Sequence, residues 1–250
     1  MIISIQGYVR RGKSKLRGWL SNPKVHGYLR VAIHFLIGFC LSAASLFQVP
    51  LPLAMALVCA SNGWSAVLVA LGGSAGYLFF WGAAGQQSVL WVVTALTITL
   101  LLPERWRSNQ TKLLMPALAG LIVSASGVVF QAWLSDTATV WQYMVRVATG
   151  AATTWLFGQM ANRRNPIVDW LACGVGVLAL AQIAPTPYLS LGVIAAGALA
   201  VAGAFPAAAL AGLALDLAGI TPVSMTAVMC AAYFVRFLPR YPKWSAAAAP

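Results

Sequence analysis

Acidic side chains are the scarcest chemical feature of this sequence. Its 250 residues hold 4 Asp and Glu against 16 Lys and Arg, and charged residues make up 8% of the chain, where a soluble domain has about a quarter. Four carboxylates spread over such a length do not build a two-metal hydrolase centre, which needs several acidic ligands at one point. The GxxxxGKS/T, HExxH and GxSxG motifs are also missing. We therefore predict no catalytic activity, no cofactor and no metal.

Histidine and cysteine are too few and too dispersed to supply a metal site. The two histidines, His26 and His34, are accompanied by no carboxylate, and each cysteine stands alone within an apolar run. We interpret the histidines as packed or facing lipid headgroups, and the cysteines as small hydrophobic side chains. The cysteines are Cys40, Cys59, Cys173 and Cys230.

Hydrophobic residues are in excess, at 60% of the chain, and the mean hydropathy is +0.81. A net charge of +12 would suggest nucleic acid as a partner in an ordinary soluble chain. Combined with this hydropathy, however, it excludes a soluble enzyme, a disordered tail and a nucleic-acid-binding module. The fold class predicted is all-α, a polytopic transmembrane helical bundle.

Polar residues and Pro or Gly divide the chain after Leu29 into ten apolar stretches. A membrane span needs about 20 apolar residues, so 50–61 and 205–219 are short, either as half-helices inside the bundle or as pieces completed by a neighbour. We predict 8 to 10 segments, with a basic arm at 1–28, the bundle at 29–240 and a tail at 241–250. The stretches are 30–47, 50–61, 64–81, 88–102, 113–133, 138–160, 167–184, 188–203, 205–219 and 222–238.

Positive charges fall almost entirely on one side if these stretches cross the membrane alternately. With the N-terminus in the cytoplasm, 15 of the 16 Lys and Arg lie in the arm together with Arg30, in the loops 103–112 and 161–166, and at the C-terminal end. Cytoplasmic loops of membrane proteins are enriched in basic residues. We therefore predict a multi-pass plasma-membrane protein with both termini in the cytoplasm. Seven tryptophans near segment ends are interpreted as interface anchors: Trp81, Trp91, Trp106, Trp133, Trp141, Trp155 and Trp170.

The arm at 1–28 contains basic residues and no acidic one. We predict that it contacts anionic lipid headgroups. It does so either as an amphipathic helix on the membrane surface, weakened by its glycines, or as a disordered basic tail. The residues expected at the headgroups are Arg10, Arg11, Lys13, Lys15 and Arg17.

Arg146 is the one basic residue outside this charge pattern, because it lies well inside the stretch 138–160, toward its predicted outer end. A structural role would have its side chain snorkel to the outer interface, or form an intramembrane ion pair with Asp216 or Asp136 at a compatible depth. A functional role would place it on a substrate or proton path. Both readings stay open.

Small residues recur at spacings of four. Gly72 and Gly76 form a GxxxG pair, and Gly203, Ala207 and Ala211 continue the same spacing in a later segment. Such positions let helix backbones approach closely in lipid. We expect them to serve packing inside the bundle or, alternatively, an oligomerisation face.

Four runs, in this order, carry a resemblance to a known family. They are HFLIGFCL at 34–41, VPLPLAMA at 49–56, VLVALGGSAG at 67–76 and AALAGLALDLAGI at 208–220. Together with the basic arm they resemble the N-terminal membrane region of the stage II sporulation protein E family of endospore-forming bacteria. The similarity covers roughly residues 25 to 240.

The resemblance implies a bacterial plasma-membrane module that anchors, self-associates and localises at the division septum with division or sporulation proteins. In that family a manganese-dependent serine phosphatase domain follows and acts in sigma-factor control. This chain ends after its last span, so we expect no phosphatase domain in it and manganese only with a separate one. It also has no acidic residue around Thr149, where the family has one in its sixth span. The alternative function is a small-solute permease or a substrate-binding membrane component of a transporter.

Overall fold

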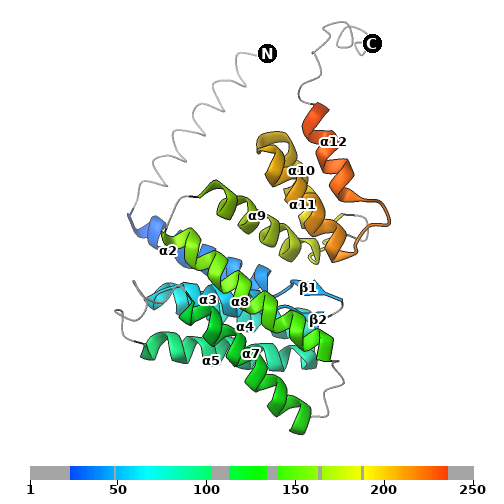
Figure 1. The fold of residues 1–250 in the computed structure, drawn as a ribbon. Helices are drawn as coiled ribbons and strands as arrows, with labels where there is room; N and C mark the ends of the chain where they lie inside the picture. The colour runs from blue at the N-terminus through cyan, green and yellow to red at the C-terminus, as the bar shows by residue number, and fades with distance from the viewer. Residues whose placement is uncertain are drawn as a thin grey trace, which may run out of the picture.

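The computed structural model describes residues 23–47, 49–102, 113–133, 140–162, 165–186 and 189–235. Helices dominate this part of the chain, so the predicted all-helical class is confirmed (Figure 1). The α-helices are α2 (Pro23–Leu41), α3 (Leu53–Ala60), α4 (Gly63–Trp81), α5 (Gly85–Leu101), α7 (Leu114–Trp133), α8 (Val140–Asn162), α9 (Pro166–Ala181), α10 (Leu191–Ala202), α11 (Phe205–Ala218) and α12 (Met225–Val235), with the 3-10 turn η1 (Gly82–Ala84).

Each predicted stretch overlaps one of these helices, and two further details differ from the prediction. A two-stranded antiparallel hairpin, β1 (Ser45–Leu46) and β2 (Val49–Pro50), lies between α2 and α3. The helix α2 begins at Pro23, so the last residues of the predicted arm are helical. The five basic residues predicted at the headgroups and the tail 241–250 lie outside the described residues.

Glycine, proline and polar caps set several helix boundaries. Asn165 accepts a hydrogen bond from the backbone N–H of Ile167 and stands before Pro166, a favourable start for α9. The α11 helix ends at Gly219, which adopts the left-handed conformation with φ 66°. Gly82, with φ 53°, separates α4 from α5. Within the described residues, Gly63–Leu101 is long and apolar enough to cross a membrane, and Gly82 divides it into two helices.

The helices α2 and α4 run in the same direction and cross closely. A Cβ added at Gly72 would strike the backbone of Phe35, and one added at Gly76 would strike that of Phe39. From the first contact to the second, the residue number rises by four on both helices, as it does when two helices run in the same direction. Gly72 and Gly76 therefore pack inside the bundle, and the chain between the two helices must return through the hairpin and α3.

The short helix α3 occupies the centre of the larger core. It contacts α2, α4, α5, α7 and α8, and six of its residues are buried. Eight residues at 1.5 Å rise span about 12 Å, so α3 alone does not cross a bilayer. The backbone before it, at 49–52, is buried as well. Tyr77, fully buried on α4, donates its hydroxyl to the carbonyl of Leu51 at 2.5 Å.

One arrangement of elements occurs twice. In the first unit (23–102) α2 is followed by the β hairpin, the short α3, and then α4 and α5; in the second unit (165–235) α9 is followed by the bridge between Thr186 and Leu189, the short α10, and then α11 and α12. In both units the first helix packs on the third, the short helix packs on the third and fourth, and the third packs on the fourth. The helices α7 and α8 join the two units.

Two hydrophobic clusters follow this division. The larger one surrounds α3 and includes side chains of α2, α4, α5, α7 and α8 and also Ala179 of α9, and the smaller one lies among α9 to α12. Figure 1 shows α9 to α12, coloured yellow-green to red, gathered on one side of the body formed by α2 to α8.

Candidate functional site

Arg146 lies in the interior of the bundle on α8. Its side chain is 5% exposed, and its Nη1 donates a hydrogen bond to Oε1 of Gln87 on α5 at 3.2 Å. The guanidinium carbon lies 5.5 Å from the ring centre of Trp91 and 5.2 Å from that of Tyr143, within the range of cation–π attraction. The prediction that Arg146 snorkels to the outer interface is therefore wrong.

The residues around Arg146 form a network that joins three helices. Gln87 donates through Nε2 to the Tyr143 hydroxyl at 3.4 Å, and Trp91 donates through Nε1 to the Ser126 hydroxyl on α7. Trp91 is fully buried and meets Tyr77 edge-on, with ring centres 6.5 Å apart. The network holds α5, α7 and α8 together, and it gives the buried guanidinium one hydrogen-bond acceptor and two aromatic faces.

Asp216 does not pair with Arg146, so the predicted intramembrane ion pair is not formed. Its carboxylate accepts hydrogen bonds from the backbone N–H groups of Met225 at 2.5 Å and Thr226 at 3.0 Å. The hydroxyls of Thr226 and Ser224 also donate to it, at 2.6 and 3.2 Å. The carboxylate caps the N-terminus of α12, where free N–H groups and the helix dipole favour a negative charge. The alternative partner, Asp136, lies outside the described residues.

The second predicted small-residue series does not lie on one helix. Gly203 follows α10 as its C-cap in an extended conformation, and α11 begins only at Phe205. Ala207 and Ala211, both on α11, are buried within the second unit. These two alanines therefore serve packing inside the protein, and Gly203 serves the turn between two helices.

Sequence reasoning missed the partners of Arg146. Gln87 stands where a polar loop was expected, and Trp91 was interpreted as an interface anchor, although its side chain is fully buried. A glutamine and an aromatic residue four positions apart at the start of a helix share one helix face, which is a usable signal. Their pairing with α8, more than fifty residues away, depends on tertiary packing.

The arrangement around Arg146 provides a cation, two aromatic faces and one amide, and its hydrogen bonds through Gln87 to Tyr143 join no nucleophile to a base. Among the described residues no three His, Cys, Asp or Glu side chains gather in one place. The four cysteines are free thiols, and His34 donates through Nδ1 to the carbonyl of Arg30 at 2.7 Å. The predictions of no enzyme activity and no cofactor stay predictions.

Comparison with known proteins gives no relative for this chain: no family model, no curated protein sequence and no solved structure matches it.

Proposed function

We propose that this chain is a non-catalytic, multi-pass membrane module with both termini on the cytoplasmic side of a bacterial plasma membrane. It anchors an assembly at the membrane and associates with further copies of itself. The observation that carries the proposal is the apolar outer surface of the helical bundle.

Large hydrophobic side chains project outward from both units. Phe79 on α4 is 74% exposed, Val128 on α7 69%, Val201 on α10 70% and Phe234 on α12 58%. Soluble monomers rarely expose large contiguous apolar patches, whereas lipid tails solvate such side chains. The surface supports insertion of the bundle in a bilayer, with α3 shielded inside it.

The parallel packing of α2 and α4 supports the proposed crossing order. Alternate crossing requires these two helices to run the same way, with the hairpin and α3 as the return path, and the Phe35–Gly72 and Phe39–Gly76 contacts have that register. The same order puts 15 of 16 basic residues on the cytoplasmic side. Septal localisation, partners from division or sporulation, and a link to sigma-factor control rest on the family resemblance alone.

The orientation is tested by labelling single cysteines in intact cells. In a background without the four native cysteines, Ser61→Cys between α3 and α4 and Ser108→Cys in the basic loop are expected to resist a membrane-impermeant maleimide. Ser135→Cys, between α7 and α8, is expected to react. Reaction of Ser108→Cys from outside would refute the proposed topology. A monomer at all protein concentrations in neutral detergent would refute self-association.

A permease is the second candidate, and the repeated unit is the observation that favours it. The short helices α3 and α10 occupy corresponding positions in the two units, and paired interrupted segments of this kind form the substrate sites of many transporters. The buried Arg146 would then face an anionic solute.

The two functions differ in what Arg146→Gln does. Proteoliposomes with the wild type or the variant are compared for uptake of labelled amino acids, nucleosides and organic anions. Uptake by the wild type that the variant loses, at unchanged stability and oligomer size, would establish a permease and contradict a purely anchoring role. If no solute is taken up by the wild type, the result would contradict the permease function and favour the anchoring function.

A further inference from the structure

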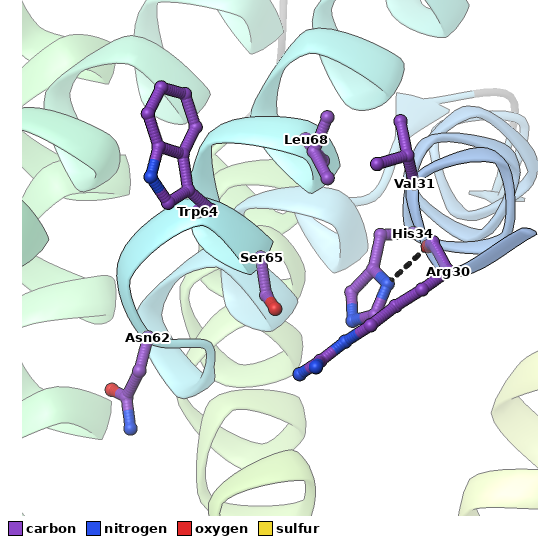
Figure 2. Close-up of a pocket in the computed structure, with 7 residues that line it drawn as sticks. All are labelled: Arg30, Val31, His34, Asn62, Trp64, Ser65 and Leu68. Carbon is purple, nitrogen blue, oxygen red and sulfur yellow. Dashed lines mark hydrogen bonds between the residues drawn. The ribbon is translucent and has the colours of Figure 1, made fainter. Parts of the chain in front are cut away.

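A small cavity lies between the middle of α2 and the start of α4, on the side of the bundle that the proposed topology places in the cytoplasm. Its volume is about 290 Å³, and its polar lining comes from Arg30 and His34 on α2 and from Asn62 and Ser65 at the beginning of α4 (Figure 2). Known ligand pockets begin at about 300 Å³, so this cavity fits a small group rather than a whole lipid.

The polar side of the cavity favours an anion. Arg30 is exposed, and the lining contains a guanidinium and an imidazole but no carboxylate. Figure 2 shows the Arg30 side chain extending beneath Ser65 toward Asn62. The Nδ1 of His34 donates to the Arg30 carbonyl, so Nε2 of the neutral ring is an acceptor, and the donor groups for an anion come from the Arg30 guanidinium.

The start of α4 adds the positive end of a helix dipole to this cation. Asn62, the N-cap residue, makes no side-chain capping bond to the helix. The first N–H groups of a helix need partners, and together with the dipole they favour a phosphate. The Arg30 side chain and the residues that begin α4 line one cavity, which gives an anion a guanidinium beside the positive end of a helix dipole.

The other side of the cavity is apolar and open to the outside. Val31, Trp64 and Leu68 line it, and Trp64 is 81% exposed. Tryptophan at a membrane interface lies at the level of the headgroups. A ligand whose charge lies at Arg30 would therefore have apolar side chains beside it. A lipid needs this arrangement, because its acyl chains begin next to the charged headgroup.

From this combination we infer that the cavity binds an anionic phosphate group, supplied by a lipid headgroup of the inner leaflet or by a free phosphate. The inference rests on the proposed membrane function for its lipid source. Bound there, the phosphate bridges α2 and α4 at the end of their close crossing.

The test uses the full chain purified in a neutral detergent. Native mass spectrometry counts the ligand bound as phosphatidylglycerol, phosphatidylcholine or inorganic phosphate is added. Arg30→Gln removes the guanidinium from an exposed position, and its melting temperature is measured to verify that the variant folds. The control, Arg107→Gln, removes the same charge from another predicted cytoplasmic loop.

Phosphatidylglycerol is expected to bind in preference to phosphatidylcholine. Arg30→Gln should weaken it about five-fold, since one basic residue at an anionic surface contributes ~1 kcal/mol. Arg107→Gln should change it less than about two-fold, because binding at this cavity depends on Arg30 and not on the overall charge. Competition by inorganic phosphate would assign the cavity to phosphate itself, and its absence would assign it to the lipid.

Equal weakening by both variants, or by neither, would overturn the inference, because binding would then follow overall charge or occur elsewhere. That failure is distinct from a failure of the proposed function. Labelling of Ser61→Cys from outside the cell would reverse the orientation and remove the inner-leaflet source, while phosphate binding that depends on Arg30 would persist.

Discussion

Asp216 gives the sharpest test of the structure, because its role changed from a predicted ion-pair partner to a helix cap. In Asp216→Ala the N–H groups of Met225 and Thr226 lose their acceptor, as do the hydroxyls of Ser224 and Thr226. The damage should be confined to the start of α12 and its contact with α11.

The magnitude follows from the number of donors released. Replacing an N-cap side chain by Ala costs about 0.5–2 kcal/mol, and loss of the charge at the helix dipole adds about 0.3–1 kcal/mol. Because Asp216→Ala releases two backbone donors and two hydroxyl donors, its loss of stability should lie near the upper end of the capping range, at about 2 kcal/mol. Asp216→Asn keeps one acceptor oxygen but loses the charge, and we expect about 1 kcal/mol.

Unfolding in mixed micelles of neutral detergent and dodecyl sulfate measures the change in free energy, and hydrogen exchange locates it. A loss of about 2 kcal/mol corresponds to roughly 30-fold faster exchange of the Met225 and Thr226 amides if α12 opens locally. The matched control is Asp169→Ala. Asp169 is an exposed carboxylate in the first turn of α9, where Asn165 already caps the helix, so its loss should be below about 0.5 kcal/mol. Equal destabilisation by the two variants would refute the capping role.

Three further predictions concern contacts inside the bundle. Arg146→Ala should lower the free energy of unfolding by about 2 kcal/mol, because it removes a hydrogen bond and two cation–π contacts. In the double variant with Asp216→Ala, the two losses should add to within about 0.5 kcal/mol. A coupling energy well above that, measured in the same unfolding titration, would show that the two side chains form an ion pair after all. Gly72→Ala should destabilise the protein by about 2 kcal/mol, because the added Cβ meets the backbone of Phe35. In the control, Gly176→Ala, the added Cβ has no atom within 4 Å, so this change should be neutral or slightly stabilising. Melting temperatures in detergent measure both effects. Tyr77→Phe removes a buried donor and should cost about 1 kcal/mol, and an unchanged unfolding midpoint would contradict that bond.

The order and limits of the helices could be predicted from sequence because their determinants are local. Pro166 after Asn165, Gly82 between two apolar runs and Gly219 after α11 mark boundaries through backbone geometry, whatever the tertiary structure. The GxxxG pair of Gly72 and Gly76 likewise indicated a close helix contact, although its partner, α2, was not foreseen.

The partners of charged side chains could not be predicted in the same way. Arg146 and Asp216 were paired because both seemed to lie at one depth, yet depth along a helix does not fix the direction of a side chain around it. Gln87 and Trp91 present their face to α8, and Asp216 lies where α12 begins beside α11. Both outcomes depend on helix rotation, which the hydrophobic spacing constrains weakly.

The repeated unit accounts for the charge pattern under the proposed topology. Four membrane-inserted helices are an even number, so each unit begins and ends on one side, and the pair α7 and α8 returns the chain to that side before the second unit starts. Basic residues flank both units: the arm and the loop 103–112 border the first, and the loop 161–166 and the C-terminal end border the second. Arg146, the one exception, belongs to neither unit. It lies in the joining pair and bonds to Gln87 of the first unit, so the one basic residue that does not orient the protein instead fastens the joining helices to it.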